Sequence, residues 1–272
     1  TEGGYCWTGC FHIQPDIEDG SNSVEVTDGM TRPYYDYERR DALWRHGSSI
    51  TPAVRALILA TVGAFVAMRL LELALTPTAG SGGGTLISAV IGVSRNGVLR
   101  RYMVWQPFTY LFAHVSLWHL FWNMFALWVF GCDVERYWGT RRFVFYYFFA
   151  GVGAGLCIIA LSAPDVLTVG ASGAVLGVLV AFAMLFPDRL ITLLLFFVFP
   201  ITVRARHLAI GYAAITFLLL ISERSGSMVS HLGHLGGMVF GYLYVKFSDA
   251  TRSRFDDVLR NIGSRRFRVP RI

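Results

Sequence analysis

The chain has 272 residues, of which 54% are hydrophobic and only 15% are charged. Soluble domains carry about 25% charged residues, so this composition, with a mean hydropathy of +0.49, indicates a protein of the lipid bilayer. The formal charge of +6 comes almost wholly from arginines at the ends of apolar runs. That placement favours membrane orientation over nucleic-acid binding.

The N-terminal region differs in charge from the rest of the chain. Residues 1–29 contain six acidic residues and no lysine or arginine, and basic residues begin at Arg32. We therefore predict four parts: a poorly ordered acidic extension (1–29), a cytoplasmic juxtamembrane segment (30–53), a membrane core (54–248) and a basic cytoplasmic tail (249–272).

Three residues of the extension, Cys6, Cys10 and His12, could supply metal ligands. Their spacing lacks the second CxxC pair that is typical of a structural zinc site, so we predict no metal.

A membrane-spanning helix needs about 20 apolar residues. Six runs approach this length, each bounded by turn or charge signals, at 54–75, 117–133, 143–162, 172–186, 207–222 and 232–248. The apolar run 190–200 is short and ends at Pro200, so we expect it to be interfacial or re-entrant. The alternative, a seventh span, would put Arg204 and Arg206 on the wrong side of the membrane.

With six spans, most arginines fall on one face, which predicts that both termini are cytoplasmic. The exceptions include Arg95, Arg100 and Arg101 in a long first external loop, 76–116. Long loops of this kind are usually functional. We expect its "WQPFTY" stretch to be strand-like and to rest in the outer leaflet.

Polar side chains are rare in the six runs and therefore narrow the search for a site. His119 and Asn123 are four residues apart, so they share one face of a helix. Ser172 follows Gly170 at the start of the fourth run, where free N–H groups and the helix dipole favour negative charge. Together with His234 from the sixth run, this serine has the parts of an activated nucleophile.

Glycines give these helices a way to approach closely. Gly173 and Gly177 form a small-xxx-small pair on the fourth run, and Gly233, Gly237 and Gly241 continue that spacing on the sixth. If the two faces meet, the serine and the histidine come together. A lone serine, histidine or glycine pair is usually a packing feature, but their joint occurrence on three runs favours a catalytic site.

Several motifs are similar to those of a known family. "HVSLWHLFWN", "GASG" and "HLGHLGG", in this order, resemble the rhomboid family of intramembrane serine proteases, as do "WQPFTYLFAH" and "VERYWGTRRFVFYY". The resemblance covers 54–248. It implies an all-α, six-transmembrane-helix bundle with a long first external loop. It also implies cleavage of single-pass membrane proteins in or near their transmembrane segments, without a cofactor or metal, in a bacterial inner membrane.

The resemblance also implies residue roles. Ser172 matches the nucleophile and His234 its general base, with no third triad member. His119 and Asn123 match the oxyanion-binding side chains, joined by the Ser172 backbone N–H, and His114 matches a structural histidine. Many members carry an aromatic residue, stacked on the catalytic histidine, where this chain has Leu176, and some carry Trp-Arg where this chain has Trp105-Gln106.

Two other functions stay open from the sequence. One is a non-catalytic rhomboid-like scaffold that binds membrane helices, and such relatives generally lack the serine or the histidine. The other is a transporter, although no internal repeat with paired broken helices is visible. The small-residue loop 222–230 is either a lid over the site or a plain connector.

Overall fold

The computed structural model describes residues 50–75, 83–195, 199–222 and 231–265. Several predictions lie outside the described residues: those on the extension 1–29, on the juxtamembrane segment up to residue 49, on Cys6, Cys10 and His12, on a lid at 223–230 and on the end of the tail, 266–272.

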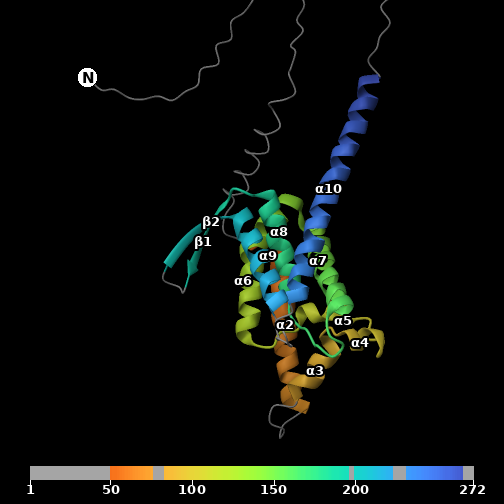
Figure 1. Ribbon diagram of the computed structural model, residues 1–272, viewed down its shortest axis with the longest axis vertical. Helices are drawn as coiled ribbons and strands as arrows, with labels where there is room; N and C mark the ends of the chain where they lie inside the picture. Colours follow the sequence, from red (N-terminus) through yellow and green to blue (C-terminus); the bar gives the residue numbers. More distant parts are fainter. Residues whose placement is uncertain (1–49, 76–82, 196–198, 223–230, 266–272) are drawn as a thin grey trace, which may run out of the picture. The chain divides into compact units, whose positions relative to one another are not determined.

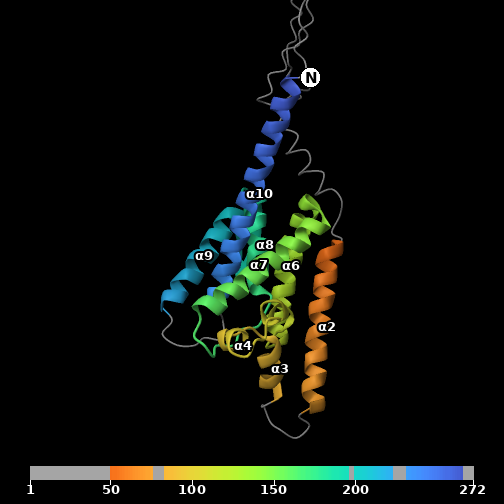
Figure 2. The same ribbon diagram turned by 90° about the vertical axis from the view of Figure 1, so that its right-hand side faces the viewer.

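Long helices form most of the described chain (Figure 1). They are α2 (Pro52–Leu75), α6 (Leu117–Trp138), α7 (Thr140–Leu161), α8 (Ser172–Leu185), α9 (Ala205–Ser222) and α10 (His231–Arg265). Each coincides with one of the six predicted runs. The last helix is much longer than its predicted span and continues past the bundle, as Figure 2 shows.

The predicted fold class, a helical membrane bundle, is confirmed. By length and composition, α2, α7 and α9 are the described helices that could each cross a membrane alone. A fourth candidate is α6 together with the short helices before it, Gln106–Phe112, to which it is bent by 96°. The total of six spans stays a prediction.

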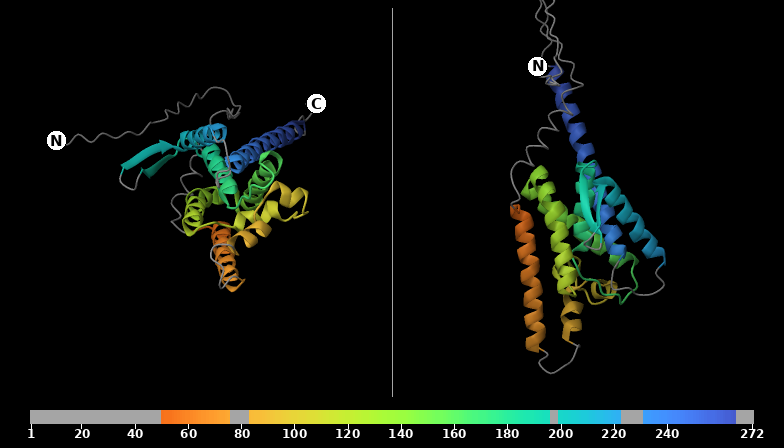
Figure 3. Two further views of the ribbon diagram at one scale, coloured as in Figure 1. Left: turned by 60° about the horizontal axis from the view of Figure 1, so that its bottom comes forward. Right: turned by 90° about the vertical axis from the view of Figure 1, so that its left-hand side faces the viewer.

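The centre of the bundle is α8, which lies between α6 on one side and α7 and α10 on the other (Figure 3). Its sequence is apolar all round, which is typical of a fully enclosed helix, and twelve of its fourteen residues are buried. At 1.5 Å per residue it is about 21 Å long, shorter than the roughly 30 Å hydrocarbon layer. The start of the helix is enclosed by the bundle, because Gly170 and Ala171 are buried and Ser172, its first residue, is half-buried.

Helix α2, which lies at one edge of the bundle (Figure 2), is fixed at its start by a carboxylate from α6. Glu135 is buried and accepts hydrogen bonds from the backbone N–H groups of Ala53 and Val54, both at 2.9 Å, and from the Thr51 and Thr140 hydroxyls. These N–H groups belong to the first turn of α2, and first-turn N–H groups have no carbonyl acceptor within their own helix. The carboxylate thus joins the start of α2 to the turn between α6 and α7.

The run 190–200 belongs to a two-stranded antiparallel hairpin rather than to a helix. Strand β1 (Leu190–Leu195) pairs with β2 (Phe199–Arg204), with Leu190 opposite Arg204. This excludes a seventh helical span and corrects the all-α description for this segment. The hairpin leaves the end of the bundle at which α8 ends and α9 begins (Figure 1).

The first loop contains α3 (Gly83–Ile91), α4 (Arg95–Leu99), α5 (Gln106–Thr109) and the 3-10 helix η1 (Tyr110–Phe112). The strand-like expectation for "WQPFTY" is wrong, because Pro107 stands in the first turn of α5, where a missing N–H costs nothing. Gln106 is fully buried in this turn. Its amide donates to the Ala89 carbonyl at 2.9 Å, and its Oε1 accepts from the Ser94 N–H at 3.2 Å.

Candidate active site

The polar centre of the bundle is a contact between the first residue of α8 and the first turn of α10. Ser172 Oγ lies 2.8 Å from His234 Nε2, although the two residues are 62 positions apart in the chain. For Nε2 to accept the hydroxyl proton, the neutral imidazole must carry its own proton on Nδ1. The geometry is that of a hydroxyl hydrogen-bonded to a base.

Glycines bring these two helices together. A Cβ on Gly237 would lie 2.8 Å from the Gly173 Cα, and one on Gly177 would lie 3.1 Å from the Gly237 carbonyl oxygen. A Cβ on Gly241 would in turn lie 3.0 Å from the Gly177 Cα. Backbone therefore packs directly on backbone over two turns, and the expected meeting of the two glycine faces is observed.

The start of α8 is also held from the opposite side, by the segment before α6. His114 is 2% exposed; the Ala171 N–H donates to its Nε2 at 3.4 Å, and its Nδ1 lies 3.4 Å from the Phe112 carbonyl oxygen. The Gly170 N–H donates to the Tyr110 carbonyl at 2.9 Å. Non-helical backbone at membrane depth needs such internal partners.

Gly170 allows the His119 ring to reach the start of α8. Its φ is +126°, a backbone conformation that is strained for any residue with a side chain. A Cβ there would lie 2.7 Å from His119 Cε1 and 2.9 Å from Nε2. The imidazole therefore rests on the Gly170 backbone, two residues before Ser172.

Asn123 lies one turn further along α6 and is 6% exposed. Its amide donates to the His119 carbonyl at 2.9 Å. Within the described part of the chain, neither Asn123 nor His119 has a hydrogen bond to Ser172. Both side chains belong to the helix face that approaches the start of α8, but their predicted role at an oxyanion remains a prediction.

The neighbours of the His234 ring include an aromatic residue that sequence reasoning missed. The Tyr212 ring, from α9, lies 6.3 Å away, and the His231 ring lies 6.2 Å away. Leu176 is buried within α8. Tyr212 is the only tyrosine in the run 207–222, and this was the signal that could have identified it.

Comparison with known proteins identifies the family. The family model for the rhomboid domain matches residues 101–248, more than half of the chain. Rhomboid protease GluP of Bacillus subtilis is 27% identical over 181 residues, which cover 65% of this chain and 32% of that protein. The mitochondrial Rhomboid protein 1 of Saccharomyces cerevisiae is 33% identical, over 49% of this chain and 38% of that protein.

The mitochondrial presenilin-associated rhomboid-like protein of Rattus norvegicus is 30% identical, over 50% of this chain and 36% of its own length. The chain thus matches about a third of the length of these relatives. One of these relatives is bacterial and two are named as mitochondrial, so a bacterial inner membrane stays a prediction for this chain. The matched region contains the contacts described above, from the segment before α6 to α10. The chain is a multi-pass integral membrane protein and belongs to the rhomboid family.

Proposed function

We propose that this chain is an intramembrane serine endopeptidase that cleaves single-pass membrane proteins in or near their transmembrane segments. In this proposal Ser172 is the nucleophile and His234 is its general base. The observation that carries the proposal is the 2.8 Å distance between Ser172 Oγ and His234 Nε2. A hydroxyl that is hydrogen-bonded to an imidazole is one arrangement that activates a nucleophile for acyl transfer.

The chemistry then has two halves. His234 Nε2 takes the Ser172 proton while Oγ attacks the carbonyl carbon of the scissile peptide bond. The tetrahedral intermediate collapses as the imidazolium returns that proton to the leaving amine, which frees one product and leaves an acyl-enzyme. Water attacks the ester with the same imidazole as base, and the second product leaves with its new carboxylate.

The negative charge of the tetrahedral oxygen needs donors. We assign this role to the Ser172 backbone N–H and to the side chains of His119 and Asn123. The contact of the His119 ring with Gly170 supports the assignment, because it brings the ring to the start of α8. Asn123 uses one amide proton on the His119 carbonyl and keeps a second for an incoming oxygen.

The proposed orientation has six spans and both termini in the cytoplasm. Two observations support it: the distribution of arginines and the hairpin β1–β2, which accounts for the leftover apolar run without a further span. In this orientation α8 starts on the outer side of the membrane midplane, and Ser172 is recessed from the outer surface because α8 is short.

The test is cleavage of a panel of single-pass membrane proteins by the purified chain in liposomes, with products identified by mass spectrometry. We expect Ser172→Ala and His234→Ala to abolish cleavage, and Ser222→Ala, a serine at the end of α9, to leave it unchanged. A fluorophosphonate probe should label wild type and not Ser172→Ala. Cleavage by the Ser172→Ala variant would overturn the proposal, and binding of substrates without cleavage by wild type would favour the scaffold function.

A further inference from the structure

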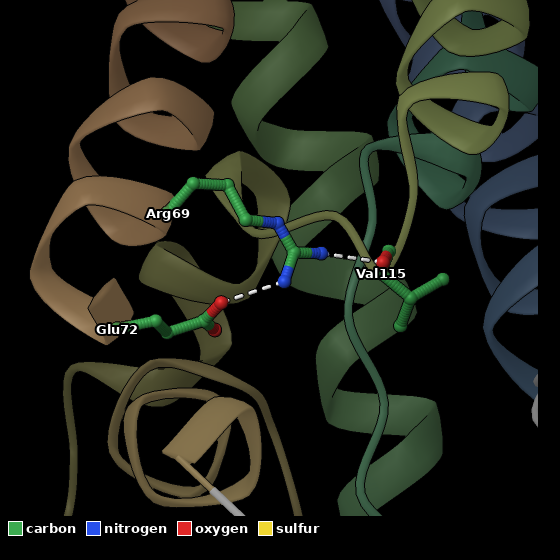
Figure 4. Close-up of polar contacts among 3 residues, drawn as sticks. All are labelled: Arg69, Glu72 and Val115. Carbon is green, nitrogen blue, oxygen red and sulfur yellow. Dashed lines mark hydrogen bonds and ion pairs between the residues drawn. The ribbon is translucent and has the colours of Figure 1, made fainter. Parts of the chain in front are cut away.

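Arg69 connects α2 to the segment that precedes α6 (Figure 4). Its Nη1 lies 2.6 Å from Glu72 Oε2 on the same helix, and its Nη2 donates to the Val115 carbonyl at 2.5 Å. Its guanidinium carbon also lies 5.1 Å from the centre of the Phe65 ring. Two acceptors on different elements and an aromatic ring therefore fix the plane of one guanidinium group.

Val115 occupies a decisive place in the connection 113–116, which joins η1 to α6. The residue before it, His114, accepts the hydrogen bond from the Ala171 N–H. The residue after it, Ser116, is the N-cap of α6, and its hydroxyl accepts from the His119 N–H at 3.1 Å. The carbonyl bound by Arg69 thus lies between the residue that holds the start of α8 and the residue that starts the helix with His119.

Apolar packing alone does not fix this end of α2. Met68 packs with Ile87 and Ala113, but Leu70, Leu71 and Leu73 are 61%, 48% and 70% exposed. The ion pair of Arg69 with Glu72 lies within one helix, so it does not join α2 to the connection 113–116. The bond to Val115 is different, because it satisfies a carbonyl of irregular backbone at a sharp bend between helices.

From this juxtaposition we propose that Arg69 is a positioning residue for the reaction. It fixes the connection 113–116 and thereby the placement of His119 and Asn123 relative to Ser172. The inference rests on the proposed function, and it adds a residue from outside the catalytic helices. Arg69 touches no reacting atom, so its effect is expected on the rate of the chemical step and not on substrate binding.

The kinetic test compares Arg69→Gln with two controls. Glu72→Gln removes the ion pair and leaves the bond to Val115, and Arg55→Gln removes an exposed arginine near the other end of α2. We expect Arg69→Gln to lower kcat about 10- to 100-fold with KM little changed, since a 1 Å misplacement costs up to about 100-fold. Both controls should stay close to wild type, and Arg69→Lys, which keeps a donor, should recover part of the loss.

A double variant separates positioning from a general loss of stability. If Arg69 acts through His119 and Asn123, the loss of rate in Arg69→Gln combined with Asn123→Ala should be smaller than the product of the two single losses, because the part that acts through Asn123 is already lost. The inference would be overturned if the loss of kcat in the double variant equalled the product of the two single losses. It would also be overturned if kcat were unchanged in Arg69→Gln.

A second measurement does not depend on activity. In the Ser172→Ala background, hydrogen exchange of the peptide covering 113–121 should be faster in Arg69→Gln and unchanged in Arg55→Gln and Glu72→Gln. Unchanged exchange in Arg69→Gln would overturn the inference whatever the kinetics. Absence of Ser172-dependent cleavage in wild type would instead refute the proposed function, and the exchange result would still decide whether Arg69 fixes the connection.

Discussion

Replacement of Gly237 by alanine tests whether the glycine faces of α8 and α10 set the distance between Ser172 and His234. A Cβ at position 237 would lie 2.8 Å from the Gly173 Cα and closer still to the Gly173 carbonyl. Carbon atoms pack at about 3.5–4.0 Å, so the two helices must separate by about 1 Å. No flexible side chain lies at this contact to absorb the change.

The separation of α8 from α10 should increase the distance between Ser172 and His234 by nearly the same amount. His234 is one turn from Gly237 on α10, and Ser172 is the residue next to Gly173 on α8. The 2.8 Å distance between Oγ and Nε2 then becomes about 3.8 Å, which is beyond hydrogen-bonding range. A displacement of this size costs about 100-fold in rate, and overpacking costs about 1–3 kcal/mol of stability.

The assay measures cleavage of a single-pass substrate in liposomes, together with the rate of fluorophosphonate labelling of Ser172 and the thermal unfolding midpoint. The matched controls are Gly63→Ala and Gly211→Ala, since a Cβ at either position meets nothing within 4 Å. We expect both controls to retain activity and to gain up to about 1 kcal/mol from helix propensity. Activity of Gly237→Ala equal to that of Gly211→Ala would refute the reasoning.

Three further outcomes follow from contacts of the site and the fold. Gly170→Ala should abolish cleavage, because a Cβ there meets the His119 ring and φ is +126°; wild-type rates would contradict this. Asn123→Ala should lower kcat about 100- to 1,000-fold, measured on the same substrate, if its amide binds the oxyanion. Glu135→Ala should lower the thermal midpoint, since each buried donor left unsatisfied costs about 1–3 kcal/mol, and Glu135→Gln should lower it less. An unchanged midpoint in Glu135→Ala would show that the cap of α2 contributes nothing.

The helices of the core could be predicted from the sequence because a membrane protein must satisfy its backbone within each segment. An apolar run of sufficient length therefore has few alternatives to a helix, and all six long helices were found this way. The approach of α8 to α10 was predictable for a similar reason. Repeated small residues at a spacing of four leave only one face on which two membrane helices can pack closely.

The errors fall where tertiary contacts outweigh local pattern. The stretch "WQPFTY" is rich in residues with high strand propensity, yet it forms α5 because buried Gln106 binds backbone groups of the loop before it. The hairpin β1–β2 was not predicted as a hairpin, since β1 ends in a continuous apolar run, Leu193–Leu195, and Pro200 lies within β2. Tyr212 was missed because the distance between its ring and that of His234 depends on how α9 packs.

Two different kinds of force set the two sides of the candidate site. Ser172 and His234 are placed by close backbone packing of α8 on α10, where an added Cβ would collide with the facing backbone. His119 and Asn123 are placed by polar contacts of the connection 113–116, namely those of His114 and Arg69. Variants on the two sides should therefore differ in kind. Glycine substitutions should slow probe labelling and cleavage together, because they move the proposed base, His234, away from the proposed nucleophile, Ser172. Loss of a polar contact should leave the proposed dyad intact and weaken only the proposed stabilisation of the tetrahedral oxygen.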